Sequence, residues 1–221
     1  VRAELASFAW GQWSQLGVLA PSKRRDNWAA DPEALLLFTL EVGRSDPRLF
    51  DETLDWLLAN QRLVGVQRLR NLAIDDEDRG LVEAAIAWVA HWQPKNRGLR
   101  PRSARAAGGE VQRLFRTLAQ EIVDPDPAFL DAGFLKPNTE PSRKSVSPDP
   151  TLPISFAFRA RLLFGVGSRA EVIRYLLTAP APNASTPVIA EAAGYARRNV
   201  SETLAALASS RLITGYERGN E

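Results

Sequence analysis

The chain has 221 residues, 45% of them hydrophobic, and its 28 Lys and Arg side chains nearly balance 26 Asp and Glu side chains. This length and composition suit one large domain or two small ones with a buried core, and the charge balance excludes a histone-like polycation and an acidic disordered tail. The absence of Cys excludes disulfides, thiolate nucleophiles, zinc ribbons and iron–sulfur clusters, and the single His excludes multi-histidine metal sites.

The sequence also lacks the features of a membrane protein. No apolar run approaches the ~18 residues that a membrane-spanning helix needs. The first residues carry Arg2 and Glu4 and do not resemble a signal peptide. We therefore expect a cytoplasmic protein that does not bind a membrane.

Helical periodicity dominates the first part of the chain. The apolar residues of Leu5–Leu16 recur at helical spacing and predict one apolar face. Asp31-Pro32 and Asp46-Pro47 each place a capping side chain before a proline at the first helical position, which predicts two helix starts. Gly43 is expected to end the first of these helices, and Asn60 the second.

The sequence patterns of the next three segments are less clear. Leu63–Leu72 fits either a helix or the beginning of a strand, and Val111–Ile122 carries a helical apolar stripe. Asp75–Asp78 precede a helix-spaced apolar series, and acidic residues suit a helix N-terminus. These four acids also look like a divalent-cation cluster. Because adjacent side chains at a helix start do not converge on one ion, a solvated helix start is the better interpretation.

Charge and proline divide the chain into zones. Residues 46–90 hold nine acidic side chains against five Arg, and residues 91–116 hold seven basic side chains against one Glu. The basic loop Lys95–Arg105 is equally consistent with a track for a phosphate backbone and with a solvated loop. Five prolines in 137–153 predict an extended linker or crossing arm. The predicted division is therefore a helical domain of residues 1–136, a linker of residues 137–153 and a C-terminal domain of residues 154–221.

The C-terminal domain has a characteristic order of predicted elements. They are a helix capped by Ser168, a short helix from Thr186-Pro187 to Gly194-Tyr195, a helix from Arg197 onward, a strand at Leu212–Tyr216 and a turn at Glu217–Asn220. Helix, short helix, tight turn, helix, strand and turn is the layout of a winged helix-turn-helix.

The segment Ser185–Glu221 resembles the winged-helix domains of bacterial transcription regulators of the MarR-like and ArsR-like groups. The resemblance extends over about residues 155–221 and does not include residues 1–136. It departs from the family pattern where the second wing strand is expected, because the sequence stops there. The resemblance implies that the helix Arg197–Ser209 enters a DNA major groove.

Helix geometry indicates which side chains of this helix face outward. With Val200, Leu204 and Leu207 turned inward, Arg198 and Glu202 point away from the core. Arg suits guanine edges or phosphates, Asn suits adenine edges, and hydroxyl groups donate to phosphates. The candidate DNA-binding residues are Thr186, Tyr195, Arg197, Arg198, Asn199, Ser201, Glu202 and Arg218. The alternative is that the two adjacent arginines are solvated surface residues.

A short internal similarity links the two parts of the chain. Phe50–Leu57 aligns with Val200–Leu207 through a shared Glu-Thr-Leu, and Arg62–Val64 aligns with Arg211–Ile213 after a one-residue shift. One interpretation is a degenerate winged-helix-like unit in the N-terminal part, and chance helical patterning explains the similarity at least as well. The outward face of such a unit would repel DNA and bind protein, for example a second copy, because it carries Asp51, Glu52 and Asp55.

Residues with catalytic or ligand-binding chemistry are few. His91 could act as a general base, but a lone His beside Trp residues is more often packed on a surface. Gly165–Ser168 faintly resembles a phosphate-binding turn, without the following pair of acids that nucleotidyltransferases need. The six Trp suit a helical core better than an aromatic effector pocket. We therefore expect no catalytic residue, no metal, no cofactor and no enzymatic activity.

The sequence thus predicts a mainly α protein with an N-terminal helical domain and a C-terminal winged helix-turn-helix. The expected function is sequence-specific binding of double-stranded DNA as a transcriptional regulator, in the form of a dimeric repressor, since two-fold protein symmetry matches palindromic DNA. The N-terminal domain would then dimerise or sense a small-molecule or protein effector. The rival interpretation is a protein-interaction adaptor, such as an antitoxin-like partner of a neighbouring gene product, whose winged helix binds protein.

Overall fold

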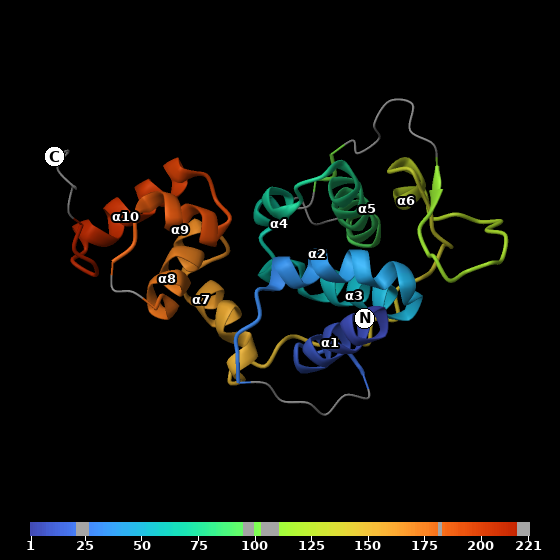
Figure 1. The fold of residues 1–221 in the computed structure, drawn as a ribbon, viewed down its shortest axis with the longest axis horizontal. Helices are drawn as coiled ribbons and strands as arrows, with labels where there is room; N and C mark the ends of the chain where they lie inside the picture. Colours follow the sequence, from blue (N-terminus) through green and yellow to red (C-terminus); the bar gives the residue numbers. More distant parts are fainter. Residues whose placement is uncertain (21–26, 95–99, 103–110, 181–182, 216–221) are drawn as a thin grey trace.

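The computed structural model describes residues 1–20, 27–94, 100–102, 111–180 and 183–215. This part of the chain is mainly helical, and its helices form two groups that lie side by side along the long axis of the molecule (Figure 1). The larger group, called the body here, contains α1 (Arg2–Gln15), α2 (Pro32–Val42), α3 (Pro47–Asn60), α4 (Val66–Leu72), α5 (Asp76–Trp92) and α6 (Pro127–Asp131). The smaller group, called the head here, contains α7 (Phe156–Phe164), α8 (Ser168–Thr178), α9 (Thr186–Ala193) and α10 (Arg197–Ser209).

The predicted helix starts of the body are confirmed at their caps. The carboxylates of Asp31, Asp46 and Asp75 each accept a hydrogen bond from the backbone N–H three residues further on. Gly43 ends α2, but the chain continues as a 3₁₀ turn over Gly43–Ser45. The ambiguous segment Leu63–Leu72 is helical from Val66 onward.

The helix predicted over Val111–Ile122 is wrong. Gln112–Arg113 form a short strand, β1, which pairs in parallel with β2 (Phe134–Leu135). Leu114 is buried as its apolar character suggests, and its N–H donates to the carbonyl of Leu135. The backbone groups of this segment are therefore satisfied by residues distant in the sequence, which a local apolar stripe does not reveal.

The core of the body is built around tryptophans. Trp13 and Trp56 are fully buried, with ring centroids 4.8 Å apart. The Trp56 indole N–H donates to the Leu16 carbonyl at 2.7 Å, and the Trp13 indole N–H donates to Thr39 Oγ1 at 2.9 Å. Trp88 is also buried, so the core interpretation is confirmed for three of the six tryptophans.

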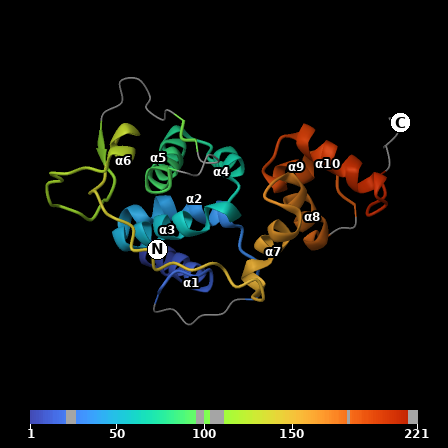
Figure 2. The same cartoon turned by 180° about the vertical axis from the view of Figure 1, so that it is seen from behind.

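The proline-rich segment 137–153 runs extended past α1 and α3 to α7, as Figure 2 shows from behind. Asp55 of α3 holds it, because its carboxylate accepts hydrogen bonds from the Ser142 hydroxyl and from the N–H groups of Arg143 and Lys144. Lys136, at the beginning of the segment, lies 3.0 Å from Asp51 Oδ1.

These contacts correct the expectation of an outward acidic face on α3. Asp55 is 3% exposed, and the side chains that face Asp51 and Asp55 come from the same chain. The chain directly after α3 continues as the 3₁₀ turn Gln61–Leu63 and then as α4 and α5, where a winged helix would have a strand. The degenerate winged-helix unit in the N-terminal part is therefore wrong.

The head has its own small core. Val172 of α8, Ile189 and Ala193 of α9, and Val200 and Leu207 of α10 are buried against one another. Gly194 ends α9 in the left-handed conformation, with φ of 70°, as the sequence predicts. Two predicted caps are displaced by one residue. Gly167 precedes α8 and Ser185 precedes α9, so Ser168 and Thr186 are the first helical residues.

The predicted wing strand is wrong for Leu212–Gly215, which contain no strand. The N–H groups of Arg211 and Leu212 donate to carbonyls of the last turn of α10, so the chain folds back on the helix end. Arg211, the residue before the predicted strand, has a positive φ of 59°, which turns the chain back toward the helix. Tyr216 and the predicted turn Glu217–Asn220 lie outside the described residues.

Candidate nucleic-acid interface

The candidate interface is the outer side of α10. Its inner side carries Val200, Thr203 and Leu207, all buried in the head. The five predicted residues of its first two turns are all exposed: Arg197, Arg198, Asn199, Ser201 and Glu202. The sequence thus predicts the outward face of this helix correctly, because the helical phase of the apolar residues fixes it.

Arg198 and Glu202 form an ion pair on this face. Arg198 Nε donates to Glu202 Oε1 at 3.0 Å, and the two side chains are 88% and 65% exposed. Ion pairs this exposed contribute little to stability. The guanidinium can therefore leave Glu202 for a nucleic-acid acceptor at small cost.

The other predicted residues lie elsewhere. Tyr195 is half-buried in the turn before α10 and faces the body, since a Cβ added to Gly65 would lie 3.3 Å from the Tyr195 hydroxyl oxygen. Burial, followed by the negative charge of Glu33, raises the pKa of Tyr195. Thr186 is half-buried at the start of α9, and Arg218 lies outside the described residues.

The body holds the turn between α9 and α10. Arg68 Nε donates to the Ala193 carbonyl at 2.8 Å, and Asn71 Nδ2 donates to the Gly194 carbonyl at 3.0 Å. A Cβ added to Gly194 would lie 3.1 Å from Cγ of Arg68, so the helix and the turn pack closely. These bonds occupy carbonyls at the end of α9 that have no partner within the helix. The body therefore fixes the direction in which α10 leaves the turn.

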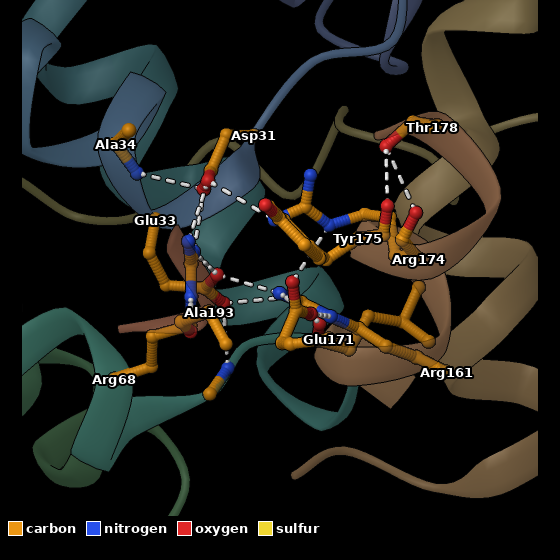
Figure 3. A network of polar contacts seen from close by, with 12 residues as sticks. Asp31, Glu33, Ala34, Arg68, Arg161, Glu171, Arg174, Tyr175, Thr178 and Ala193 are labelled. Carbon is orange, nitrogen blue, oxygen red and sulfur yellow. Dashed lines mark hydrogen bonds and ion pairs between the residues drawn. The ribbon is translucent and has the colours of Figure 1, made fainter. Parts of the chain in front are cut away.

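A buried ion cluster joins body and head beside this turn (Figure 3). We call it the junction cluster; its members are Asp31, Glu33, Arg68, Arg161, Glu171 and Arg174. Glu33 of α2 is at its centre and has no exposed surface. Both of its oxygens accept hydrogen bonds from Arg161 of α7, at 2.7 and 2.6 Å, and Oε2 also accepts one from Arg68 of α4 at 2.7 Å.

The charges of the junction cluster balance, with three arginines against three carboxylates. Burial by itself raises the pKa of Glu171, but the charges of Arg161 and Arg174 outweigh it and leave the pKa below its ordinary value. Burial acts in the same direction on Asp31, and the hydrogen bond and charge of Arg68 again lower the pKa. Both carboxylates are therefore held in the charged form.

The sequence does not reveal this cluster. Asp31 is recognisable only as a helix cap, and Glu33 only as an acid in a first helical turn. Arg161 is one of two arginines in α7, and nothing local distinguishes it from the exposed Arg159. Nothing in the spacing connects residues 33 and 161, because their pairing depends on how head and body pack.

The lowered pKa values predict a dependence of stability on pH. A carboxylate whose pKa is lowered by folding contributes stability above its unfolded pKa, and this contribution is lost as pH falls through the folded pKa. The contribution of Asp31 and Glu171 to the free energy of unfolding should therefore decrease as the solution is acidified below about pH 5, toward and beyond the ordinary pKa values of Asp and Glu. Urea unfolding followed by Trp fluorescence at a series of pH values measures this decrease.

The control for this prediction is Glu171→Gln, which removes one of the two lowered groups. Between neutral and acid pH, the wild type should lose more free energy of unfolding, or gain less, than this variant. Four other carboxylates have pKa values that burial raises, and they titrate in both proteins and cancel in the comparison: Asp51, Glu52, Asp78 and Asp126. Equal pH dependence in the two proteins would contradict the assignment.

The remaining sequence candidates do not gather into one site. His91 is exposed at the end of α5 and packs edge-on against the Trp92 ring. Asp75 is the cap of α5, and among the described residues no group of three His, Asp or Glu side chains could hold a metal ion. Of the basic loop Lys95–Arg105, the structure describes residues 100–102, which are exposed.

A shallow cavity of about 850 Å³ lies between the starts of α1 and α3. Trp10 lines it, with Arg48 stacked 5.5 Å from the centre of one of its rings. The Trp10 indole N–H donates to the Asp46 carboxylate at 2.9 Å. This is the place in the described structure that comes nearest to the aromatic effector pocket considered from the sequence.

Comparison with protein-family models, with curated proteins and with solved structures finds no match for the chain. None of the helices in the described ranges has both the length and the apolar character needed to cross a membrane. The order of α9, turn and α10, the exposed side of α10 and the junction cluster are therefore the observations on which a function can be built.

Proposed function

We propose that the protein is a sequence-specific DNA-binding transcriptional regulator that places α10 in a major groove of double-stranded DNA. The observation that carries this proposal is the order of α9, a three-residue turn and α10, with Arg197, Arg198 and Asn199 exposed on the first turn of α10. In DNA-binding helix-turn-helix proteins, residues near the start of the second helix contact base edges.

The side chains on this face have the required chemistry. Arg198 can donate two hydrogen bonds to a guanine edge, and Asn199 can pair with an adenine edge. Ser201 can donate to a phosphate. Without DNA, Glu202 is the hydrogen-bond partner of Arg198. When Arg198 binds DNA, the Glu202 carboxylate can accept a hydrogen bond from a cytosine amino group.

The proposed regulator is a dimeric repressor. Two heads related by two-fold symmetry match the two half-sites of a palindromic operator. A repressor that blocks polymerase sterically requires no catalytic residue.

Arg198→Ala tests the proposal. The wild type should bind the duplex that lies upstream of its own gene, prefer it to random duplex, and bind more weakly as salt rises. The variant should lose about 1–3 kcal/mol of discrimination between the two duplexes, because a bidentate base contact disappears. Fluorescence anisotropy at two salt concentrations measures both effects.

Arg159→Ala is the matched control, since Arg159 is exposed on α7 of the same head. Its discrimination should equal that of the wild type. If the wild type binds neither duplex at low salt, the proposal is wrong. If the Arg198 variant loses affinity by the same factor for both duplexes, Arg198 contacts a phosphate and not a base.

A second candidate function is a protein-binding adaptor, such as an antitoxin-like partner of a neighbouring gene product. The observation that favours it is an apolar surface on the head: Leu162 and Leu163 of α7 are 64% and 77% exposed, and Phe164 is 44% exposed. Apolar patches of this kind often bind protein. Co-purification with the product of the neighbouring gene, lost on Leu163→Asp, would support this candidate.

A further inference from the structure

The exposed edge of α4 lies directly beside the turn that precedes α10. Asn71 donates to the Gly194 carbonyl, and Gln67, one helical turn earlier, donates to Asn71 Oδ1 at 2.8 Å. Both side chains are exposed. Residues four apart on a helix have Cβ atoms about 5–6 Å apart. The edge therefore extends away from the start of α10 by about one helical turn.

Two exposed arginines continue this edge. Arg102 Nη2 donates to the Gln67 side-chain oxygen at 3.4 Å, and the Arg102 N–H donates to Glu83 Oε2 at 2.8 Å. The Arg100 carbonyl accepts a hydrogen bond from Arg70 at 2.7 Å. The backbone around Arg100 and Arg102 is thus fixed to α4 and α5.

The acidic residue nearest to these arginines is already neutralised. Both oxygens of Glu83 accept hydrogen bonds from Arg70, at 2.6 and 2.9 Å. The neutral amide of Gln67 does not cancel the charge of Arg102. The edge therefore presents positive charge to solvent next to the start of α10.

We propose that Gln67, Asn71, Arg100 and Arg102, called the flanking edge, form a second part of the DNA interface and bind phosphates of the strand that borders the groove entered by α10. This inference rests on the proposed function. The major groove is about 12 Å wide, so the phosphates that border a helix within it lie within reach of long side chains on a neighbouring element. Phosphate contacts of this kind fix register and orientation without reading sequence.

The flanking edge also gives the body a role in binding. Arg68 and Asn71 fix the turn, and Arg70 fixes Arg100, so α10 and the flanking edge belong to one rigid arrangement. Contacts to phosphate from the flanking edge and to bases from α10 then require no rearrangement of α10 relative to α4, which lowers the cost of association.

The double variant Arg100→Ala/Arg102→Ala tests the inference. Each lost phosphate contact reduces the slope of log K against log salt by about 1, so the double variant should have a slope less negative by about 2. Its affinity should fall by the same factor for the upstream duplex and for random duplex. Anisotropy titrations between about 50 and 200 mM salt give both quantities.

The matched control is Arg2→Ala/Arg48→Ala, which removes two exposed arginines from the starts of α1 and α3, at the end of the body far from the head (Figure 1). Its slope should equal that of the wild type. Equal slopes in the two double variants, or a loss of discrimination in Arg100→Ala/Arg102→Ala, would overturn the inference while DNA binding itself stands. A wild type that binds no DNA would overturn the proposed function and the inference together.

Discussion

Replacing Arg161 by Met is expected to lower the free energy of unfolding by about 3–5 kcal/mol. The Arg161 guanidinium is nearly fully buried and donates to Glu33, to Glu171 and to the Leu63 carbonyl. Without it, Glu33 keeps Arg68 and the Gly65 N–H as its partners, and Glu171 keeps Arg174. A buried carboxylate that loses its partner is far more costly than a lost surface ion pair.

Arg159→Met is the control for this variant, because Arg159 lies two residues away on the same helix and is exposed. Its free energy of unfolding should fall by only about 0.5 kcal/mol, because an exposed cation–π contact such as that of Arg159 with the Phe156 ring contributes little. Urea unfolding at neutral pH measures both variants. Equal losses would show that the junction cluster does not stabilise the packing of head on body.

The parts of the fold that depend on local sequence are predicted well. Asp31-Pro32 and Asp46-Pro47 determine helix starts through a cap and a fixed φ, and both are confirmed. Gly194 is predicted and observed as the end of α9. The outward face of α10 is also predicted, because Val200 and Leu207 fix the phase of the helix. In each case the cause lies within about one helical turn.

The errors occur where distant residues satisfy the backbone or a charge. Val111–Ile122 has the apolar spacing of a helix, yet its N–H groups donate to Gly133, Leu135 and Arg44 instead. Asp55 has the position of an exposed acid on α3, yet an extended segment almost ninety residues later covers it. Composition and periodicity contain no information about such partners.

Some features of the candidate site follow from local sequence, and others depend on the packing of distant residues. Exposure of Arg197 and Arg198 follows from the helix phase, whereas the burial of Tyr195 follows from contact with the body. Arg68 and Asn71 are ordinary polar residues of a short helix in the sequence, and only the packing of head on body brings them to the turn. The sequence therefore predicts which residues of α10 face outward, but not what holds that helix in place.

Trp56→Ala should also lower the free energy of unfolding by about 3–5 kcal/mol. Trp56 is fully buried, and its ring lies 4.8 Å from that of Trp13 in α1 and 6.0 Å from that of Phe158 in α7. The substitution leaves a cavity at the meeting point of α1, α3 and α7 and removes the donor to the Leu16 carbonyl. Because Phe158 belongs to the head, removing the Trp56 ring should weaken the packing of the head on the body as well as the core of the body.

Two further variants separate these contributions. Trp56→Phe keeps an aromatic ring but lacks the indole N–H. Its free energy of unfolding should fall by about 1–3 kcal/mol, because a buried carbonyl is left without its donor. Trp28→Ala should cost less than Trp56→Ala, because Trp28 is 48% exposed. Urea unfolding followed by far-UV circular dichroism avoids the change in Trp fluorescence. If the Trp28 and Trp56 variants lost equal stability, Trp56 would not be the residue that joins the core of the body to the head.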